Sequence, residues 1–323
     1  MNGAEARPHG DAEGHLREEH PRGGMGDYGR RLRFGHYLDP GAGTEPVTTA
    51  QRADRLGLEL LGIADRPYDG RCLDAPALMA TVLAAARRIR VFPAVACLPL
   101  RPPVVLAKTI ASLDVLSGGR VELGLGCGTA PDGVRSFGGR SLPAAGARAA
   151  LEEAVLVVRS MWDGGNGIHF RGEHYRVDGA RPGPAPAHPI GVWLGVTGPR
   201  SLALAGRIAD GWIALSSRVP PARLPDAQRR IDEAALEAGR DPAEIRRVYV
   251  LNGSIDRGAA RRPEPRGLLN GDPVRWADEI AELAVGYGVD SFLYGGDPAD
   301  LEVFALEIVP EVRETVGRER ARS

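Results

Sequence analysis

The sequence predicts a closed (β/α)8 TIM barrel, an α/β fold, formed by a single domain. Two observations lead to this fold class. Short apolar runs alternate with longer stretches whose apolar residues recur at helical spacing, and about eight such strand–helix pairs occupy about 290 of the 323 residues. Parallel crossover units of this number and length fit a closed barrel, and a doubly wound open sheet is the competing architecture.

The expected strands are short apolar runs, and each is followed by an expected helix. The strands are predicted at residues 32–37, 58–63, 89–96, 121–125, 190–196, 211–215, 245–252 and 289–294. The helices are predicted at residues 47–56, 73–88, 102–116, 144–162, 199–208, 224–238, 273–285 and 298–312.

Glycine and proline mark several helix ends. Gly57 and Gly239 follow two of the helices, where a residue in the left-handed conformation commonly closes the last turn. Pro102 and Pro103 open another helix in its first turn, where proline is tolerated. Between the fourth helix and the fifth strand, residues 168–177 alternate in the manner of a small hairpin. This stretch is too short for a second domain and is expected to be an insertion.

Composition excludes several classes of function. The net charge of −1 provides no overall field for binding nucleic acid or an anionic membrane. No apolar run approaches the roughly 20 residues that span a bilayer, and the polar N-terminus does not resemble a secretory signal. The three cysteines Cys72, Cys97 and Cys127 lack disulfide or metal-ligand spacing, so no metal site is expected. We expect a cytoplasmic protein with a small-molecule substrate and no nucleic-acid or membrane partner.

Residues 1–30 differ from the rest of the chain. They are rich in glycine, glutamate, histidine, proline and arginine, and such a segment cannot bury enough apolar surface to offset its ordering entropy. We therefore expect a disordered tail at residues 1–30 and a barrel domain at residues 31–318. Met25 is an alternative start of translation.

The residues that follow the expected strands are the candidates for a site, because TIM barrels place their active sites at the C-terminal ends of the strands. These positions are rich in small residues and lack the paired carboxylates of glycosidases and the His/Asp clusters of metal hydrolases. Small residues at several strand ends favour a flat or bulky ligand that lies against the backbone.

Two glycine-rich turns are the strongest of these positions. At residues 195–200 a strand runs into a Gly-Pro turn and a helix begins, which is a typical anion site with Arg200 nearby, although an ordinary turn has the same pattern. At residues 123–128 the dinucleotide-binding pattern fails, because Thr129 stands where it needs glycine. These glycines either contact a ligand or allow close backbone packing. Asp114, Ser117 and Arg120 are expected to form a structural contact at the bottom of the barrel.

Several stretches together resemble the bacterial luciferase-like family of flavin-dependent oxidoreductases, which includes many coenzyme F420 enzymes. The matching stretches are ADRLGLE at 53–59, RIRVFPAV at 88–95, LPLRPP at 98–103, LDVLSGGR at 113–120, LGLGCG at 123–128, WLG at 193–195, GPR at 198–200 and ADGW at 209–212. The resemblance covers about residues 31–316.

The resemblance implies FMN or coenzyme F420 as cofactor, with its ring in the barrel mouth. A bulge around Ala94 and Val95, often a non-proline cis peptide in similar proteins, would press on one face of the ring. The cofactor phosphate would lie at the glycine turn of residues 195–200. The cofactor-binding residues are then expected to be Ala94, Val95, Ala96, Gly126, Cys127, Gly128, Gly195, Val196, Thr197, Gly198, Pro199 and Arg200. The family also implies a homodimer and a separate flavin reductase or F420 reductase as partner.

One difference from the family motif affects the predicted catalytic residues. Similar proteins have Asp-His-Pro after the second strand, whereas this chain has Asp65, Arg66 and Pro67. Arginine does not titrate at useful pH and cannot act as a general acid or base, but it can hold an anionic substrate or the negative charge of a reduced flavin. His36, at the end of the first strand, is a substitute acid or else a structural residue. The catalytic candidates are Arg66, His36 and Asp65.

The sequence thus predicts a flavin-dependent oxidoreductase of the luciferase-like monooxygenase type. It would use reduced FMN with molecular oxygen, or coenzyme F420 for hydride transfer, on a small organic substrate. Because Arg66 replaces histidine, a flavin-binding barrel without catalysis is an alternative. A phosphate-binding barrel lyase is a further one, but such a lyase needs a buried amine, and Lys108 is the only lysine and lies on an expected helix.

Overall fold

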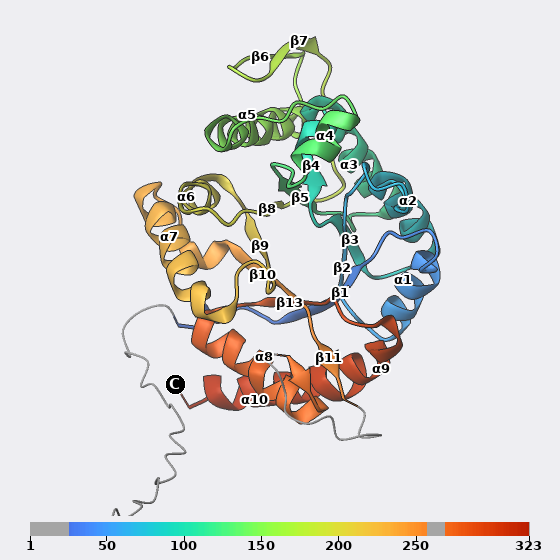
Figure 1. The fold of residues 1–323 in the computed structure, drawn as a ribbon. Helices are drawn as coiled ribbons and strands as arrows, with labels where there is room; N and C mark the ends of the chain where they lie inside the picture. The colour runs from blue at the N-terminus through green and yellow to red at the C-terminus, as the bar shows by residue number, and fades with distance from the viewer. Residues whose placement is uncertain (1–25, 257–268, 323) are drawn as a thin grey trace, which may run out of the picture.

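The structure, a computed structural model, describes residues 26–256 and 269–322. A ring of parallel strands stands at the centre of the molecule and helices surround it (Figure 1). The strands are β1 (Arg33–Leu38), β2 (Leu60–Ile63), β3 (Arg90–Pro93), β4 (Ala96–Cys97), β5 (Leu123–Gly126), β8 (Val192–Leu194), β9 (Gly211–Leu215), β10 (Arg246–Leu251) and β13 (Ser291–Tyr294). They pair in the order β3-β2-β1-β13-β10-β9-β8-β5-β4.

The ring has eight strand positions, because β3 and β4 are the two halves of one strand. A cis peptide bond between Ala94 and Val95 separates the halves. Below this break, a parallel bridge between Val91 and Val121 joins the two ends of the sheet order and closes the barrel. The predicted (β/α)8 barrel is confirmed, and the doubly wound open sheet is wrong. The third strand was expected to be continuous over residues 89–96, whereas the bulge that the family resemblance implied interrupts it.

Most helices lie where the sequence places them. They are α1 (Pro46–Arg55), α2 (Ala75–Ala85), α3 (Pro103–Ser117), α4 (Pro131–Ser136), α5 (Ala144–Asp163), α6 (Pro199–Ile208), α7 (Leu224–Glu237), α8 (Pro273–Tyr287), α9 (Leu301–Val303) and α10 (Val309–Arg320). The short helix α4 was not predicted. The insertion is the predicted hairpin, formed by β6 (Ile168–Arg171) and β7 (Arg176–Ala180), and it projects beyond α5 (Figure 1). A further short parallel pair joins β11 (Ser254–Ile255) to β12 (Asn270–Gly271).

Two helix ends differ from the prediction for identifiable reasons. Helix α2 was expected to reach residue 88 but ends at Ala85, because the backbone N–H groups of Arg87, Arg88 and Ile89 donate to the carboxylate of Asp54. The last helix was expected to end at residue 312. It continues through a π-helical turn (Phe304–Ile308) to Arg320, and its buried Val316 extends the apolar face that packs on α8.

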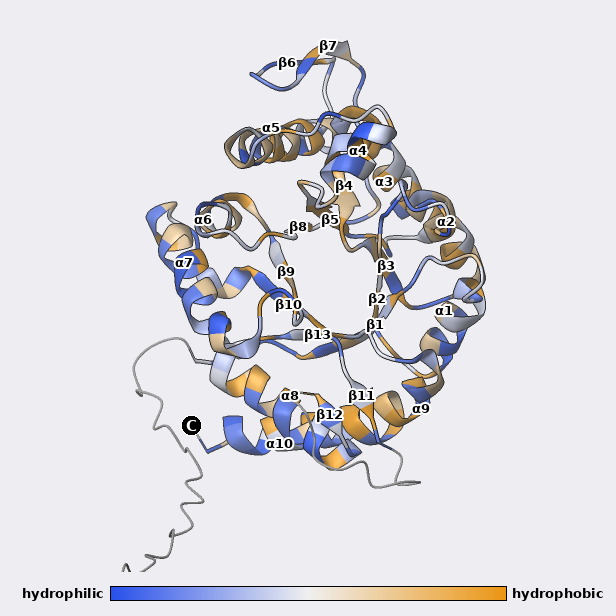
Figure 2. Cartoon of the chain, in the orientation of Figure 1, coloured by the Kyte–Doolittle hydropathy of each residue, from blue (hydrophilic) through white to orange (hydrophobic). Residues whose placement is uncertain are grey.

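The core has two layers. The larger layer lies between the sheet and the helices, which carry hydrophobic and hydrophilic residues side by side (Figure 2). The smaller one fills the barrel and includes Phe92, Trp193, Ile213, Val250 and Leu293. The rings of Phe92 and Trp193 meet edge to face with centroids 4.8 Å apart. Inside the barrel, this packing leaves room for a ligand above the strand ends.

The predicted contact among Asp114, Ser117 and Arg120 at the bottom of the barrel is present, but it runs through backbone groups. Ser117 Oγ donates to the carbonyl of Asp114, and Arg120 donates to Ser117 from its backbone N–H and its Nε. The Asp114 carboxylate has other partners. The carboxylate of Asp114 is fully buried and accepts hydrogen bonds from the backbone N–H groups of Val121 and Ala187, at 3.2 and 2.8 Å. It also accepts one from Nδ1 of His188 at 2.9 Å. Asp114 therefore ties α3 to the segment that leads into β8.

The expected tail at residues 1–30 lies mostly outside the described residues. No helix among those described combines the length and the apolar character needed to cross a membrane.

Candidate active site

A cavity of about 310 Å3 opens at the C-terminal ends of the barrel strands. Its walls come from β1, β4, β5 and β9 and from residues that follow β2, β3, β5, β8 and β9, which are distant in sequence. Among its lining residues are eleven of the fifteen candidates: Asp65, Arg66, Ala94, Val95, Ala96, Gly126, Cys127, Gly128, Gly195, Val196 and Thr197. The structure therefore brings most of the predicted site to one place.

Val95 forms part of the floor of this cavity. A Cβ atom on Gly126 would lie 2.4 Å from Cγ2 of Val95, and one on Gly195 would lie 2.8 Å from its Cγ1. Neither distance is possible between real side chains, so both glycines are needed to seat the valine. For the glycines at residues 123–128 the sequence left ligand contact and close packing open, and close packing explains Gly126. Gly195, in the other glycine turn, is needed for the same reason. The half-buried valine presents its apolar side chain to the cavity.

Gly198, Pro199 and Arg200 do not line the cavity. They are exposed and form the start of α6, directly after the lining residue Thr197. No side chain caps this helix, and the carbonyl of Gly198 accepts from the N–H groups of Ser201 and Leu202. The positive end of the helix dipole therefore lies at the rim of the cavity, where a phosphate would meet it.

Asp65 is buried in the wall of the cavity and holds two other segments. Its Oδ2 accepts from the backbone N–H of Cys97 at 2.9 Å and from Nε of Arg101 at 2.8 Å, and its Oδ1 accepts from Nη2 of Arg101 at 2.7 Å. A carboxylate with both oxygens engaged by a guanidinium is a poor proton carrier. Its geometry is that of a positioning residue, which fixes the chain directly after the Val95 bulge.

Arg66 lies between the first cavity and a second one. The second cavity measures about 300 Å3, lies above β1, β10 and β13, and shares Tyr37 and Arg66 with the first. Nη2 of Arg66 donates to Oδ1 of Asp39 at 3.0 Å. Its Nε–H is buried and has no hydrogen-bond partner among the described residues. A buried, unpaired donor is costly in a finished protein and fits an acceptor supplied by a ligand.

His36 lines the second cavity and is 2% exposed. Its Nδ1 lies 2.7 Å from the carbonyl oxygen of Tyr294, and a carbonyl only accepts, so Nδ1 carries the proton. Burial lowers the pKa of His36 to about 4, although the bond to Tyr294 opposes the shift. The ring is therefore neutral near pH 7, and its Nε2 is a hydrogen-bond and proton acceptor.

Sequence reasoning missed several lining residues: Tyr37, Ala64, Tyr68, Thr129, Ile213, Leu215 and Arg218. Their signal was position, because all except Ile213, which lies in the middle of β9, are near the end of a strand. Arg218 brings a second guanidinium to the cavity, beside that of Arg66. Lys108 is exposed on α3, so the described residues offer no buried lysine for lyase chemistry at this mouth.

Comparison with known proteins identifies relatives in the family that the sequence motifs indicated. The family model described as luciferase-like monooxygenase matches residues 31–264. The F420-dependent glucose-6-phosphate dehydrogenase of Amycolatopsis mediterranei is 29% identical over 218 residues, 65% of each chain. The F420-dependent hydroxymycolic acid dehydrogenase of Mycobacterium tuberculosis is 34% identical over 167 residues, 49% of this chain and 43% of that protein. Each match spans less than two thirds of the relative.

Solved structures share the fold. An F420-dependent secondary alcohol dehydrogenase superposes with a TM-score of 0.78 at 21% identity, over 88% of this chain and 100% of the other. A riboflavin lyase solved with modified FMN gives a TM-score of 0.76 at 17% identity, over 88% of this chain and 92% of the other. F420 and FMN, the two cofactors expected from the sequence, thus both occur in the names of similar proteins. The chain belongs to the luciferase-like monooxygenase family of oxidoreductases.

Proposed function

We propose that this protein is an F420-dependent dehydrogenase that oxidises an alcohol bearing an anionic group. The observation that carries the proposal is the pair of joined cavities at the barrel mouth. One has an apolar floor of suitable shape for a flat ring, and the other is lined by the neutral His36, with Arg66 between them. The matched relatives are named for F420-dependent oxidation, which favours this cofactor over FMN.

The residues present fit such a cofactor. The Val95 side chain and the backbone at Gly126 and Gly195 would support one face of the ring, and the start of α6 at Gly198 would hold the phosphate. The unpaired Nε–H of Arg66 would donate to a substrate beside the ring. When bound, the cofactor supplies the hydride acceptor.

His36 is the residue that would accept the proton of the substrate hydroxyl. Oxidation of an alcohol releases the hydroxyl proton, and the unprotonated Nε2 of His36 can accept it, as a weaker base than an ordinary imidazole because its pKa is about 4. The bond between Nδ1 of His36 and the Tyr294 carbonyl fixes the ring orientation and tautomer throughout. The second cavity, which His36 lines, is where the hydroxyl would lie.

Arg66 defines the substrate class. A guanidinium held by Asp39 at Nη2, with Nε unpaired, is suited to a phosphate or carboxylate. The two relatives named above are called dehydrogenases of glucose 6-phosphate and of a hydroxy acid, and both are hydroxyl compounds with an acid group. We therefore place the anionic group of the substrate at Arg66.

Titration of the full chain with coenzyme F420 and with FMN tests the cofactor. We expect F420 to bind at least tenfold more tightly and its visible absorbance to fall when glucose 6-phosphate or a short hydroxy acid is added. Binding of neither cofactor would contradict the proposal. Tighter binding of FMN, with oxygen consumption after reduction, would instead support an FMN monooxygenase served by a separate reductase, a second candidate that the family description favours.

The Arg66→Gln variant tests the substrate class. We expect its KM for an anionic alcohol to rise about tenfold or more, because a hydrogen bond to a charged group is lost. The kcat for an uncharged alcohol such as propan-2-ol should not change. Arg71→Gln is the matched control, because Arg71 lies on the same loop, is exposed and pairs with Asp69. An equal loss on both substrates would show that Arg66 does not contact the anionic group.

A further inference from the structure

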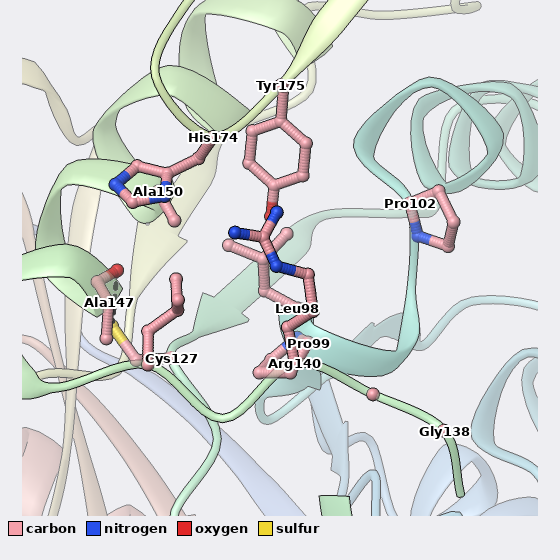
Figure 3. A pocket seen from close by; sticks show the side chains of 12 residues that line it. Leu98, Pro99, Pro102, Cys127, Gly138, Arg140, Ala147, Ala150, His174 and Tyr175 are labelled. Atoms are coloured by element: carbon pink, nitrogen blue, oxygen red, sulfur yellow. Dashed lines mark hydrogen bonds between the residues drawn. The ribbon is translucent and has the colours of Figure 1, made fainter. Parts of the chain in front are cut away.

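We propose that a third chamber, separate from the two mouth cavities, binds a small carboxylate with an apolar tail. The chamber measures about 280 Å3 and lies between α5, the β6–β7 hairpin and the loops that follow β4 and α4 (Figure 3). Its walls are mostly apolar, with Leu98, Pro99, Leu142, Ala147 and Ala150 among them. This size and lining are typical of a pocket for a small ligand.

His174 is the first sign of a missing ligand. Its side chain is 7% exposed, and neither ring nitrogen has a hydrogen-bond partner among the described residues. The nearest carboxylate oxygen, on Glu173, is 3.9 Å from Nε2, too far for a hydrogen bond. Figure 3 shows the imidazole at the chamber wall beside Ala150. Buried polar atoms normally have partners, so an unpaired imidazole in a cavity wall indicates a group that arrives with a ligand.

The hairpin holds this imidazole in a fixed place. The carboxylate of Glu153, on α5, accepts from the backbone N–H groups of Glu173, His174 and Tyr175 at 2.7, 3.0 and 2.9 Å. Three hydrogen bonds to one carboxylate tie the turn of the hairpin to the helix. The chamber is therefore already formed, and a ligand would not have to order this turn before it binds.

Arg140 makes the polar end of the chamber cationic, and Tyr175 adds a hydroxyl there. The hydroxyl of Tyr175 points toward the guanidinium of Arg140 (Figure 3). Burial raises the pKa of Tyr175 to about 12, so the hydroxyl remains protonated and can donate. No acidic residue is among the residues that line the chamber. The guanidinium and the phenol, with the imidazole elsewhere on the chamber wall, fit a carboxylate head, and the apolar walls fit its tail.

The chamber adjoins the cofactor cavity at Cys127, which lines both. The thiol remains protonated there, because Sγ donates to the carbonyl of Ala147 at 3.4 Å and burial raises its pKa to about 11. Cys127 thus acts as a wall between two compartments. A ligand in the chamber is next to the cofactor without occupying its place.

Calorimetric titration of the full chain with octanoate, in the absence of cofactor, tests the proposal. We expect saturable binding at one site per chain, with octan-1-ol and octylammonium at least tenfold weaker. His174→Leu and Arg140→Gln should each weaken octanoate binding about tenfold, and Ala150→Phe, which fills the chamber, should abolish it. The matched controls are His169→Leu, on the same hairpin but exposed, and Arg135→Gln, on α4 and paired with Asp132.

The outcomes are distinct from those of the proposed function, because no cofactor is present. His174→Leu removes an unpaired polar group, so its melting temperature should equal or exceed that of the wild type, which separates lost binding from lost folding. Equal affinity for octylammonium, or unchanged octanoate binding by Ala150→Phe, would overturn the proposal. Displacement of octanoate by saturating F420 or FMN would also overturn it, since the chamber would then belong to the cofactor.

Discussion

Replacing His36 with glutamine is expected to lower kcat for alcohol oxidation by about a hundredfold or more, the usual contribution of a positioned proton acceptor. Glutamine occupies a similar volume and can keep the contact with the Tyr294 carbonyl, but it cannot accept a proton. The Kd for F420 should change little, because His36 lines the second cavity and not the cavity with the apolar floor. Steady-state kinetics and a binding titration on the same preparation measure the two effects.

The pH profile provides the decisive control. Since the folded-state pKa of His36 is about 4, the wild-type rate should hold down to about pH 5 and then fall as the ring becomes protonated. The same depressed pKa means that stability is fully present above the ordinary histidine pKa, near 6.5, and decreases as pH falls from there toward 4. The pH dependences of rate and of stability should lack this acid-side fall in His36→Gln. Both should retain it in His169→Gln, because His169 is exposed. An unchanged kcat in His36→Gln would remove histidine from the mechanism.

Replacing Asp65 with asparagine is expected to lower the free energy of unfolding by about 3 kcal/mol, the lower end of the range for breaking a buried ion pair. The side chain of Asp65 is 1% exposed and that of Arg101 is 16% exposed, so the guanidinium loses its best partner inside the protein. Asparagine can still accept from the Cys97 N–H, which preserves the loop in part. Urea denaturation measures the loss. The affinity for F420 should fall with it, because Cys97 follows Ala96 in the cavity wall.

Asp74→Asn is the matched control for this prediction. Asp74 binds the same arginine at 2.6 Å, but its side chain is 49% exposed, and asparagine retains its role as N-cap of α2. We expect a change below about 1 kcal/mol, as for other solvated ion pairs. Similar losses in the two variants would show that Arg101, and not the burial of Asp65, determines the energetics.

Much of the fold was predictable because its signals are local. The periodicity of apolar residues placed α6 (Pro199–Ile208) and β9 (Gly211–Leu215) at the residues observed. The helix ends that were predicted wrongly depend on residues distant in the sequence. Asp54 accepts hydrogen bonds from the N–H groups that would have extended α2, and packing on α8 stabilises the last helix as far as Arg320. The break at Ala94 and Val95 came from the family resemblance and not from periodicity, since the strand pattern continues through it.

The sequence by itself determined the barrel, the family and the ring of small residues at the strand ends, because each depends on the identity and spacing of nearby residues. The tertiary structure decided what those residues do. Gly126 and Gly195 make room for Val95, Asp65 is committed to Arg101, and the Nε–H of Arg66 and the ring of His174 are buried without partners. Whether a polar group is paired depends on which chain segments fold against it, and the local sequence pattern does not identify those segments.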